Sequence, residues 1–197
     1  MRKLALIPFL TLAVVGSAQG PSPKEVMLGR KVFIALTPDV KKELKITSDQ
    51  DKKLATVFEG VLQMEGEKIM VTMTPDTDLD KLEKDALAVL EETQRARLTE
   101  IWLQRLGGLA LADEEIAKQL SLTETQKKSA AELLAKGSDQ IMELMHSGPS
   151  EDAHKQAQTA RKEVGKKMEA LLDDKQKLAF EVLKGKPFKT KDSKDGG

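Results

Sequence analysis

A short sequence motif occurs four times in this chain, and its spacing constrains the fold more than any other feature. In each copy an apolar residue is followed by a threonine or an acid, two polar residues and a glutamine. Threonine with glutamine three residues later is a capping box, in which each side chain bonds the other residue's backbone N–H at a helix start. The motif residues are Ile46, Thr47, Gln50, Leu90, Gln94, Leu122, Thr123, Gln126, Leu172, Asp173 and Gln176.

The four copies differ in how strongly they predict a helix start. The copies at 46–50 and 122–126 carry the threonine, so we expect helices to begin there. The copies at 90–94 and 172–176 lack it, and the helical spacing of apolar residues runs on across them. Leu82, Ala86 and Leu90, for example, continue to Leu98 and Ile101. At these two copies a helix start stays open beside the alternative that the motif lies inside a long helix or at a kink.

The order of the motifs indicates an internal duplication. The segment from Leu36 aligns without gaps to the segment from Ala112, and the segment from Ala88 aligns to the one from Ala170. We predict two halves, 36–106 and 109–184, joined at Gly107-Gly108. Each half would be a short helix, a capped helix, a turn and a second long helix. Chance similarity among helices rich in Lys, Glu and Leu is the competing explanation.

The fold class follows from composition and periodicity. The segments between the Pro and Gly clusters are rich in good helix formers, and their apolar residues recur at helical spacing. One such face is Leu54, Val57, Phe58, Val61, Leu62 and Ile69. We find no convincing alternation of β-branched residues. The prediction is an all-α protein of tandemly duplicated antiparallel helical hairpins, with no sheet.

The first residues have the layout of a secretory signal peptide. Arg2 and Lys3 precede an apolar run, and Gly16 and Ala18 are small residues at the positions that precede cleavage. The run is shorter than the roughly 20 apolar residues that span a membrane. We expect cleavage after Ala18, export to the periplasm or secretion, and no stable membrane insertion afterwards. A segment at 19–35 would precede the first half, and 185–197 would be a disordered Lys-rich tail.

Charge and composition narrow the possible partners. The chain has 32 basic and 32 acidic residues, so it has no global electrostatic reason to bind nucleic acid. It has no cysteine, so packing alone must hold an exported fold together. It also has no tyrosine and only two histidines, His146 and His154. A catalytic site needs a positioned acid, base, nucleophile or metal, and we find none. We predict no enzymatic activity and no cofactor.

Export, the absence of cysteine and the L-T-x-x-Q motif together make the chain resemble the Spy/CpxP family of bacterial periplasmic proteins. Leu122, Thr123 and Gln126 match the motif in full, and Ile46, Thr47 and Gln50 match with Ile in place of Leu. The resemblance implies a role in the envelope stress response. Family members include an ATP-independent chaperone, a repressor partner of a sensor kinase, and metal sensors.

The resemblance also suggests an assembly and partners. The chaperone relatives are antiparallel homodimers with two motifs per chain, whereas this chain has four motifs. We therefore expect it to fuse two such units and to act as a monomer or homodimer. Its partners would be unfolded proteins or an envelope sensor protein. The residues proposed to bind clients are Lys52, Lys53, Met64, Met70, Met73, Arg95, Arg97, Lys127 and Lys128, although the basic ones also fit ordinary helix-surface charges.

Metal binding is a further alternative. Met142, Met145, His146 and His154 combine thioethers and imidazoles, which suit Cu(I), and the imidazoles also suit Zn(II). The two methionines lie on the same apolar stripe as Ile141 and Leu144. Because methionine often fills gaps in cores, we favour a packing role for them.

Overall fold

The computed structural model describes residues 11–14, 27–65, 68–73, 77–146 and 151–189. The chain forms two compact units. The first centres on Val32–Leu98, and the second comprises Thr99–Phe188 with the segment that ends at Lys31. The boundary falls inside helix α6 (Glu92–Leu106).

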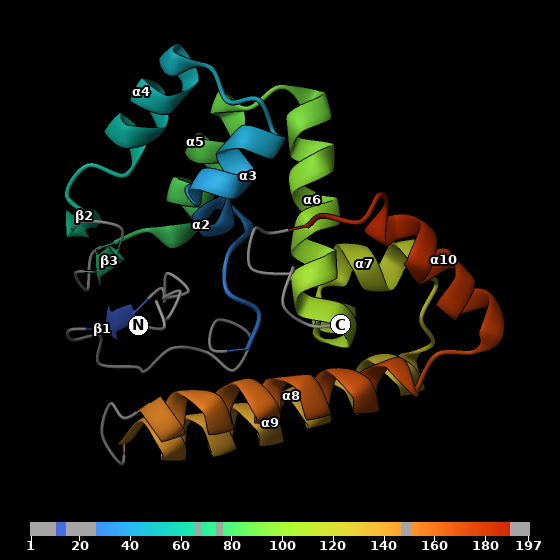
Figure 1. The fold of residues 1–197 in the computed structure, drawn as a ribbon. Helices are drawn as coiled ribbons and strands as arrows, with labels where there is room; N and C mark the ends of the chain where they lie inside the picture. Colours follow the sequence, from blue (N-terminus) through green and yellow to red (C-terminus); the bar gives the residue numbers. More distant parts are fainter. Residues whose placement is uncertain (1–10, 15–26, 66–67, 74–76, 147–150, 190–197) are drawn as a thin grey trace, which may run out of the picture. The chain divides into compact units, whose positions relative to one another are not determined.

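The described part of the chain is mainly helical, as the periodicity predicts (Figure 1). The first unit contains α3 (Pro38–Glu43), α4 (Ser48–Val57), α5 (Leu79–Val89) and the start of α6, and α2 (Lys31–Ala35) lies at its beginning. The second contains the rest of α6, the 3-10 helix η1 (Gly107–Ala112), α7 (Glu114–Gln119), α8 (Glu124–His146), α9 (Glu151–Glu169) and α10 (Asp174–Lys184).

The prediction that the fold has no sheet is wrong. Strands β1 (Thr11–Val14), β2 (Leu62–Glu65) and β3 (Lys68–Met73) form a small sheet in the order β1-β3-β2. Strand β2 pairs antiparallel with β3, with Leu62 opposite Val71, and β1 pairs parallel with β3. The prediction that one helical face extends from Leu54 to Ile69 is therefore also wrong. Helix α4 ends at Val57, Gly60 follows with φ +78°, and the β-branched residues of β3 suit a strand.

Apolar side chains from all the helices of the first unit are buried. The Phe33 and Phe58 rings are 5.9 Å apart and tilted, and Leu54, Ala86 and Leu98 are each at most 1 % exposed. At the surface, Arg97 of α6 pairs with Glu43 of α3 at 2.7 Å. The N-terminal part of α6 is thereby fixed to the short helix that precedes α4.

The second unit is organised around a long hairpin. Helices α8 and α9 lie side by side and run antiparallel (Figure 1). The 3-10 helix η1 packs on α9 through Gly108, where a side chain would meet the Gly165 carbonyl oxygen. Buried side chains in this unit include Ile141, Val164 and Met168. The hairpin is thus held against η1, which connects α6 to α7.

The alternative of one long helix across the second and fourth motifs is wrong, because two helices meet at each. Helix α5 ends at Val89 and α6 begins at Glu92, while α9 ends at Glu169 and α10 begins at Asp174. Leu90 takes an extended conformation with ψ 144°, and so does Asp173 with ψ 174°. Apolar periodicity continues across both breaks because the helices on either side contribute to one core.

The structure describes only parts of the predicted signal peptide and of the predicted tail. Of the predicted signal peptide 1–18, only Thr11–Val14 lies within the described residues, and cleavage after Ala18 would remove β1 from the sheet. The predicted disordered tail 185–197 is ordered at its start, because Gln104 bonds the backbone of Lys186 and Phe188. Within the described residues, no helix is both long and apolar enough to cross a membrane.

Candidate functional site

The glutamines of the motifs pair with one another, which sequence analysis did not anticipate. In the first unit, Gln50 Nε2 donates to Gln94 Oε1 at 2.7 Å, and Gln94 Nε2 donates to Gln50 Oε1 at 3.1 Å. Gln50 also donates to the Val89 carbonyl, and Gln94 donates to the Leu44 carbonyl. We call this reciprocal pair, with its backbone bonds, the first glutamine clasp.

The second unit contains a second glutamine clasp, built from Gln126 and Gln176. Gln126 Nε2 donates to Gln176 Oε1 at 2.7 Å, and Gln176 Nε2 donates to Gln126 Oε1 at 3.1 Å. Gln126 also donates to the Leu171 carbonyl and Gln176 to the Leu120 carbonyl, at 2.7 and 3.4 Å. Each bond has its counterpart at the aligned residue of the first clasp.

Each clasp joins the starts of two helices. The glutamine oxygens accept the backbone N–H of their own caps, at Thr47 and Glu91 in the first clasp and at Thr123 and Asp173 in the second. Every amide oxygen therefore accepts at least two bonds, and every amide nitrogen donates two. Gln94 and Gln176 are 8 % and 9 % exposed, so this complete pairing satisfies amides that would be costly to bury unpaired.

A left-handed residue precedes each clasp. Lys45 has φ 54° and Ser121 has φ 51°, and they follow Leu44 and Leu120, whose carbonyls the clasps bond. These two conformations end α3 and α7 and turn the chain toward the capped helix. The turn from short helix to capped helix thus has the same backbone geometry in both units.

The predicted caps are present. A full capping box forms at Thr47–Gln50, and Thr123 Oγ1 likewise accepts from the Gln126 N–H at 3.2 Å. A full capping box also forms at Asp173–Gln176, where the sequence leaves a helix start open beside a helix interior or a kink. An aspartate carboxylate accepts the same N–H that a threonine hydroxyl would, which is why the motif functions there without threonine.

We expect Thr123→Ala to lower the free energy of unfolding by about 1 kcal/mol, because it removes the cap's acceptor. Urea titration followed by circular dichroism would measure the change. Thr123→Ser should retain most of the stability. Thr125→Ala, at an exposed position in the same first turn, is the matched control. Equal losses at positions 123 and 125 would show that the cap contributes nothing specific.

The predicted client-binding residues do not form one cluster. Lys52 and Lys53 are exposed on α4, and Lys127 and Lys128 are exposed on α8 in the other unit. Lys127 pairs with Glu124 at 2.7 Å. Met64 lies in β2, and Met70 and Met73 lie in β3; their side-chain positions are outside the described part.

The two arginines predicted to bind clients have structural partners. Arg95 donates to the carbonyls of Leu87 and Leu90, where α5 ends. Arg97 pairs with Glu43, as described above, and its side chain is only 18 % exposed. Both arginines therefore secure the junctions of α6 within the first unit and present little charge to a client.

The candidate metal ligands lie toward one end of the α8–α9 hairpin. Met142, Met145 and His146 are in the last turns of α8, and His154 is in the first turn of α9. Met142 is half-buried, and the side chains of the other three are outside the described part. Among the described residues, no group of three His, Cys, Asp or Glu side chains is placed to hold a metal ion.

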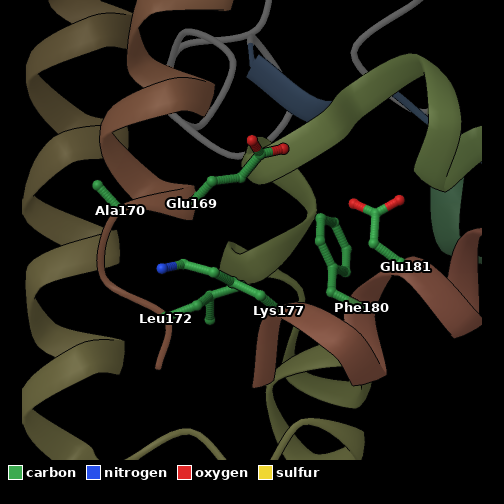
Figure 2. A pocket seen from close by; sticks show the side chains of 6 residues that line it. All are labelled: Glu169, Ala170, Leu172, Lys177, Phe180 and Glu181. Atoms are coloured by element: carbon green, nitrogen blue, oxygen red, sulfur yellow. The ribbon is translucent and has the colours of Figure 1, made fainter. Parts of the chain in front are cut away.

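A pocket of about 300 Å³ lies between the end of α9 and α10 (Figure 2). Its lining is Glu169, Ala170, Leu172, Lys177, Phe180 and Glu181. Figure 2 shows the Glu169 and Glu181 carboxyl groups on the side to which the Phe180 ring points, while Lys177 extends away from them. The lining thus combines charged and apolar groups.

Helix α10 also exposes an apolar pair. Leu178 is 70 % exposed and Val182 is 78 % exposed. Within the described residues, these two are the large hydrophobic side chains that are exposed. Phe180, two residues from each, is 2 % exposed. Residues two apart lie on opposite sides of a helix, so the sequence L-A-F-E-V could have revealed this pair once Phe180 was assigned to the core.

Comparison with known proteins adds no further information about this site. No protein-family model matches the chain, and no curated protein or solved structure is significantly similar to it.

Proposed function

We propose that this chain is an exported, ATP-independent protein-binding protein that holds unfolded clients. The observation that carries the proposal is the exposed pair Leu178 and Val182 on α10. Exposed Lys175 lies on the same helix, and Lys177 is also exposed there but pairs with Asp174 at 3.5 Å. An apolar contact beside positive charge suits segments of unfolded proteins, which present apolar side chains and carboxylates together.

The size of the pair fits transient binding. Burying a Val or Leu side chain contributes about 1.5–3 kcal/mol, so the pair would contribute roughly 3–6 kcal/mol before the costs of association. Even before those costs, this corresponds to dissociation constants of roughly 6 mM to 40 µM, so the pair alone gives weak binding that permits repeated capture and release without nucleotide. No observation on the described residues favours the alternatives, a regulatory partner of an envelope sensor or a metal-binding protein.

The proposal also includes the architecture. The clasps, the left-handed residues and the order of helices correspond between the two units, and this supports a tandem duplication in which each unit is stabilised by its own clasp. A duplicated chain already contains two such units, so it would not need to dimerise to bring two of them together. Sedimentation showing an obligate dimer at micromolar concentration would contradict a monomeric working form.

The test is an aggregation assay on metal-stripped protein, residues 19–197, with a reduced, unfolding client and no nucleotide. We expect equimolar protein to suppress light scattering. The double variant Leu178→Ser/Val182→Ser should lose at least half of that suppression at an unchanged melting temperature, since both side chains are exposed. Ala179→Ser, at another exposed position of α10, is the matched control. A wild-type protein inactive against several clients would refute the holding function.

A further inference from the structure

The backbone that follows α10 is bound by a single side chain of α6. Gln104 Nε2 donates to the carbonyl oxygens of Lys184 and Lys186, the latter at 2.7 Å. Gln104 Oε1 accepts from the N–H of Phe188, also at 2.7 Å. These three bonds reach alternate residues and involve backbone atoms only. Because the partner atoms in the segment are backbone atoms, these bonds could form whatever side chains the segment carries.

Two contacts beside Gln104 do depend on side chains. The Arg105 guanidinium lies 5.9 Å from the centre of the Phe188 ring, a cation–π distance. Gly185 has φ +61°, and a Cβ there would lie 2.2 Å from Glu100 Cδ. Pro187 restricts the backbone between them. The positive φ of Gly185 thus favours glycine at one position, and Arg105 favours an aromatic ring three residues later.

The bound segment can leave without unfolding the helices. Lys186 and Pro187 are exposed, and Gly185–Phe188 lies after the last residue of α10. Two hydrogen bonds from Gln104 and one partly exposed ring contact are among the interactions that hold it. Exposed terminal segments open at much lower free energy than a whole domain. We call Gly185–Phe188 the strap.

We propose that Glu100, Gln104 and Arg105 form a peptide-binding site on α6, which the strap occupies as a built-in ligand. The external ligand is an extended peptide with glycine followed, three residues later, by an aromatic residue. Gln104 would bond its backbone, Arg105 would cover its ring, and the positive φ bound beside Glu100 would favour glycine at that position. The strap competes in cis, so an external peptide binds in proportion to the fraction of open sites.

This site is independent of the holding function proposed above. It lies on α6, whereas that proposal rests on Leu178 and Val182 of α10. A peptide titration can fail while aggregation is still suppressed, and the reverse is equally possible. The two proposals are therefore tested separately.

The experiment is an NMR titration of the ¹⁵N-labelled full chain with the peptide Gly-Lys-Pro-Phe-Lys, which copies residues 185–189. The readout is the side-chain amide signal of Gln104. In Phe188→Ala the strap loses its ring contact, so its competition weakens, and the added peptide should bind about tenfold more tightly than to the wild type. Lys189→Ala changes an exposed neighbour and should bind the peptide as the wild type does.

Two further outcomes decide the proposal. Adding Gln104→Ala to Phe188→Ala should abolish binding, followed in this variant by the backbone amide signals of α6 because the Gln104 side-chain signal is absent, while circular dichroism remains that of the folded chain. The proposal is overturned if peptide at millimolar concentration leaves the Gln104 amide signal unchanged in Phe188→Ala. Equal peptide affinity for the wild type and Phe188→Ala would also overturn it, since the strap would then not be a competitor.

Discussion

Replacing Gln176 with alanine is expected to lower the free energy of unfolding by about 3–4 kcal/mol. The substitution leaves the Leu120 carbonyl, the Asp173 N–H and one Gln126 N–H without their clasp partner. Each unsatisfied buried group costs about 1–3 kcal/mol, and groups near the surface recover part of this by bonding water. Urea unfolding followed by circular dichroism would measure the loss.

Two further variants sharpen this experiment. Gln119→Ala removes an exposed glutamine whose amide makes only a 3.4 Å bond to Glu115 on the same helix, so it should change stability by less than about 0.5 kcal/mol. Gln94→Ala should destabilise the first unit about as much as Gln176→Ala destabilises the second, because the clasps correspond bond for bond. Loss at only one of the two clasps would argue against equivalent roles and weaken the proposed duplication.

The second large effect is expected at Gly108, where η1 meets α9. A Cβ on Gly108 would lie 2.0 Å from the Gly165 carbonyl oxygen and 2.7 Å from Glu169 Cγ. Backbone cannot yield as a flexible side chain does, so η1 would have to move away from α9. We expect Gly108→Ala to cost about 3 kcal/mol, at the upper end of overpacking effects.

The partner glycine supplies the control for Gly108. A Cβ on Gly165 would lie 3.7 Å from its nearest neighbours, which is ordinary contact, and Gly165 is inside α9. Gly165→Ala should therefore be neutral or raise stability by up to about 1 kcal/mol through better helix propensity. Melting temperatures of the two variants give the comparison. Similar losses for both would mean that the close approach is not what makes Gly108 necessary.

Local sequence determined the helices and their starts. The capping boxes at Thr47 and Thr123 need only residues within one helical turn, so three-residue spacing was enough to predict them. The same locality explains why a cap at Asp173 was underestimated: apolar spacing continued across it, and spacing alone does not distinguish one helix from two that share a core. The sequence did not predict strands β2 and β3, because the alternation of apolar and polar residues in them is short and lies between strong helical patterns.

Tertiary structure decided what the motif glutamines and the end of the chain do. Gln50 and Gln94 are 44 residues apart, and Gln126 and Gln176 are 50 apart, so no local pattern could specify that their amides bond each other. Gln104 and Phe188 are likewise 84 residues apart, and the hydrogen bond between them holds the start of a tail that the sequence predicts to be disordered. The sequence by itself determined where α4 and α8 begin, because each cap is satisfied within one turn. Only the folded chain decided which caps meet, because side-chain pairing depends on how the helices pack.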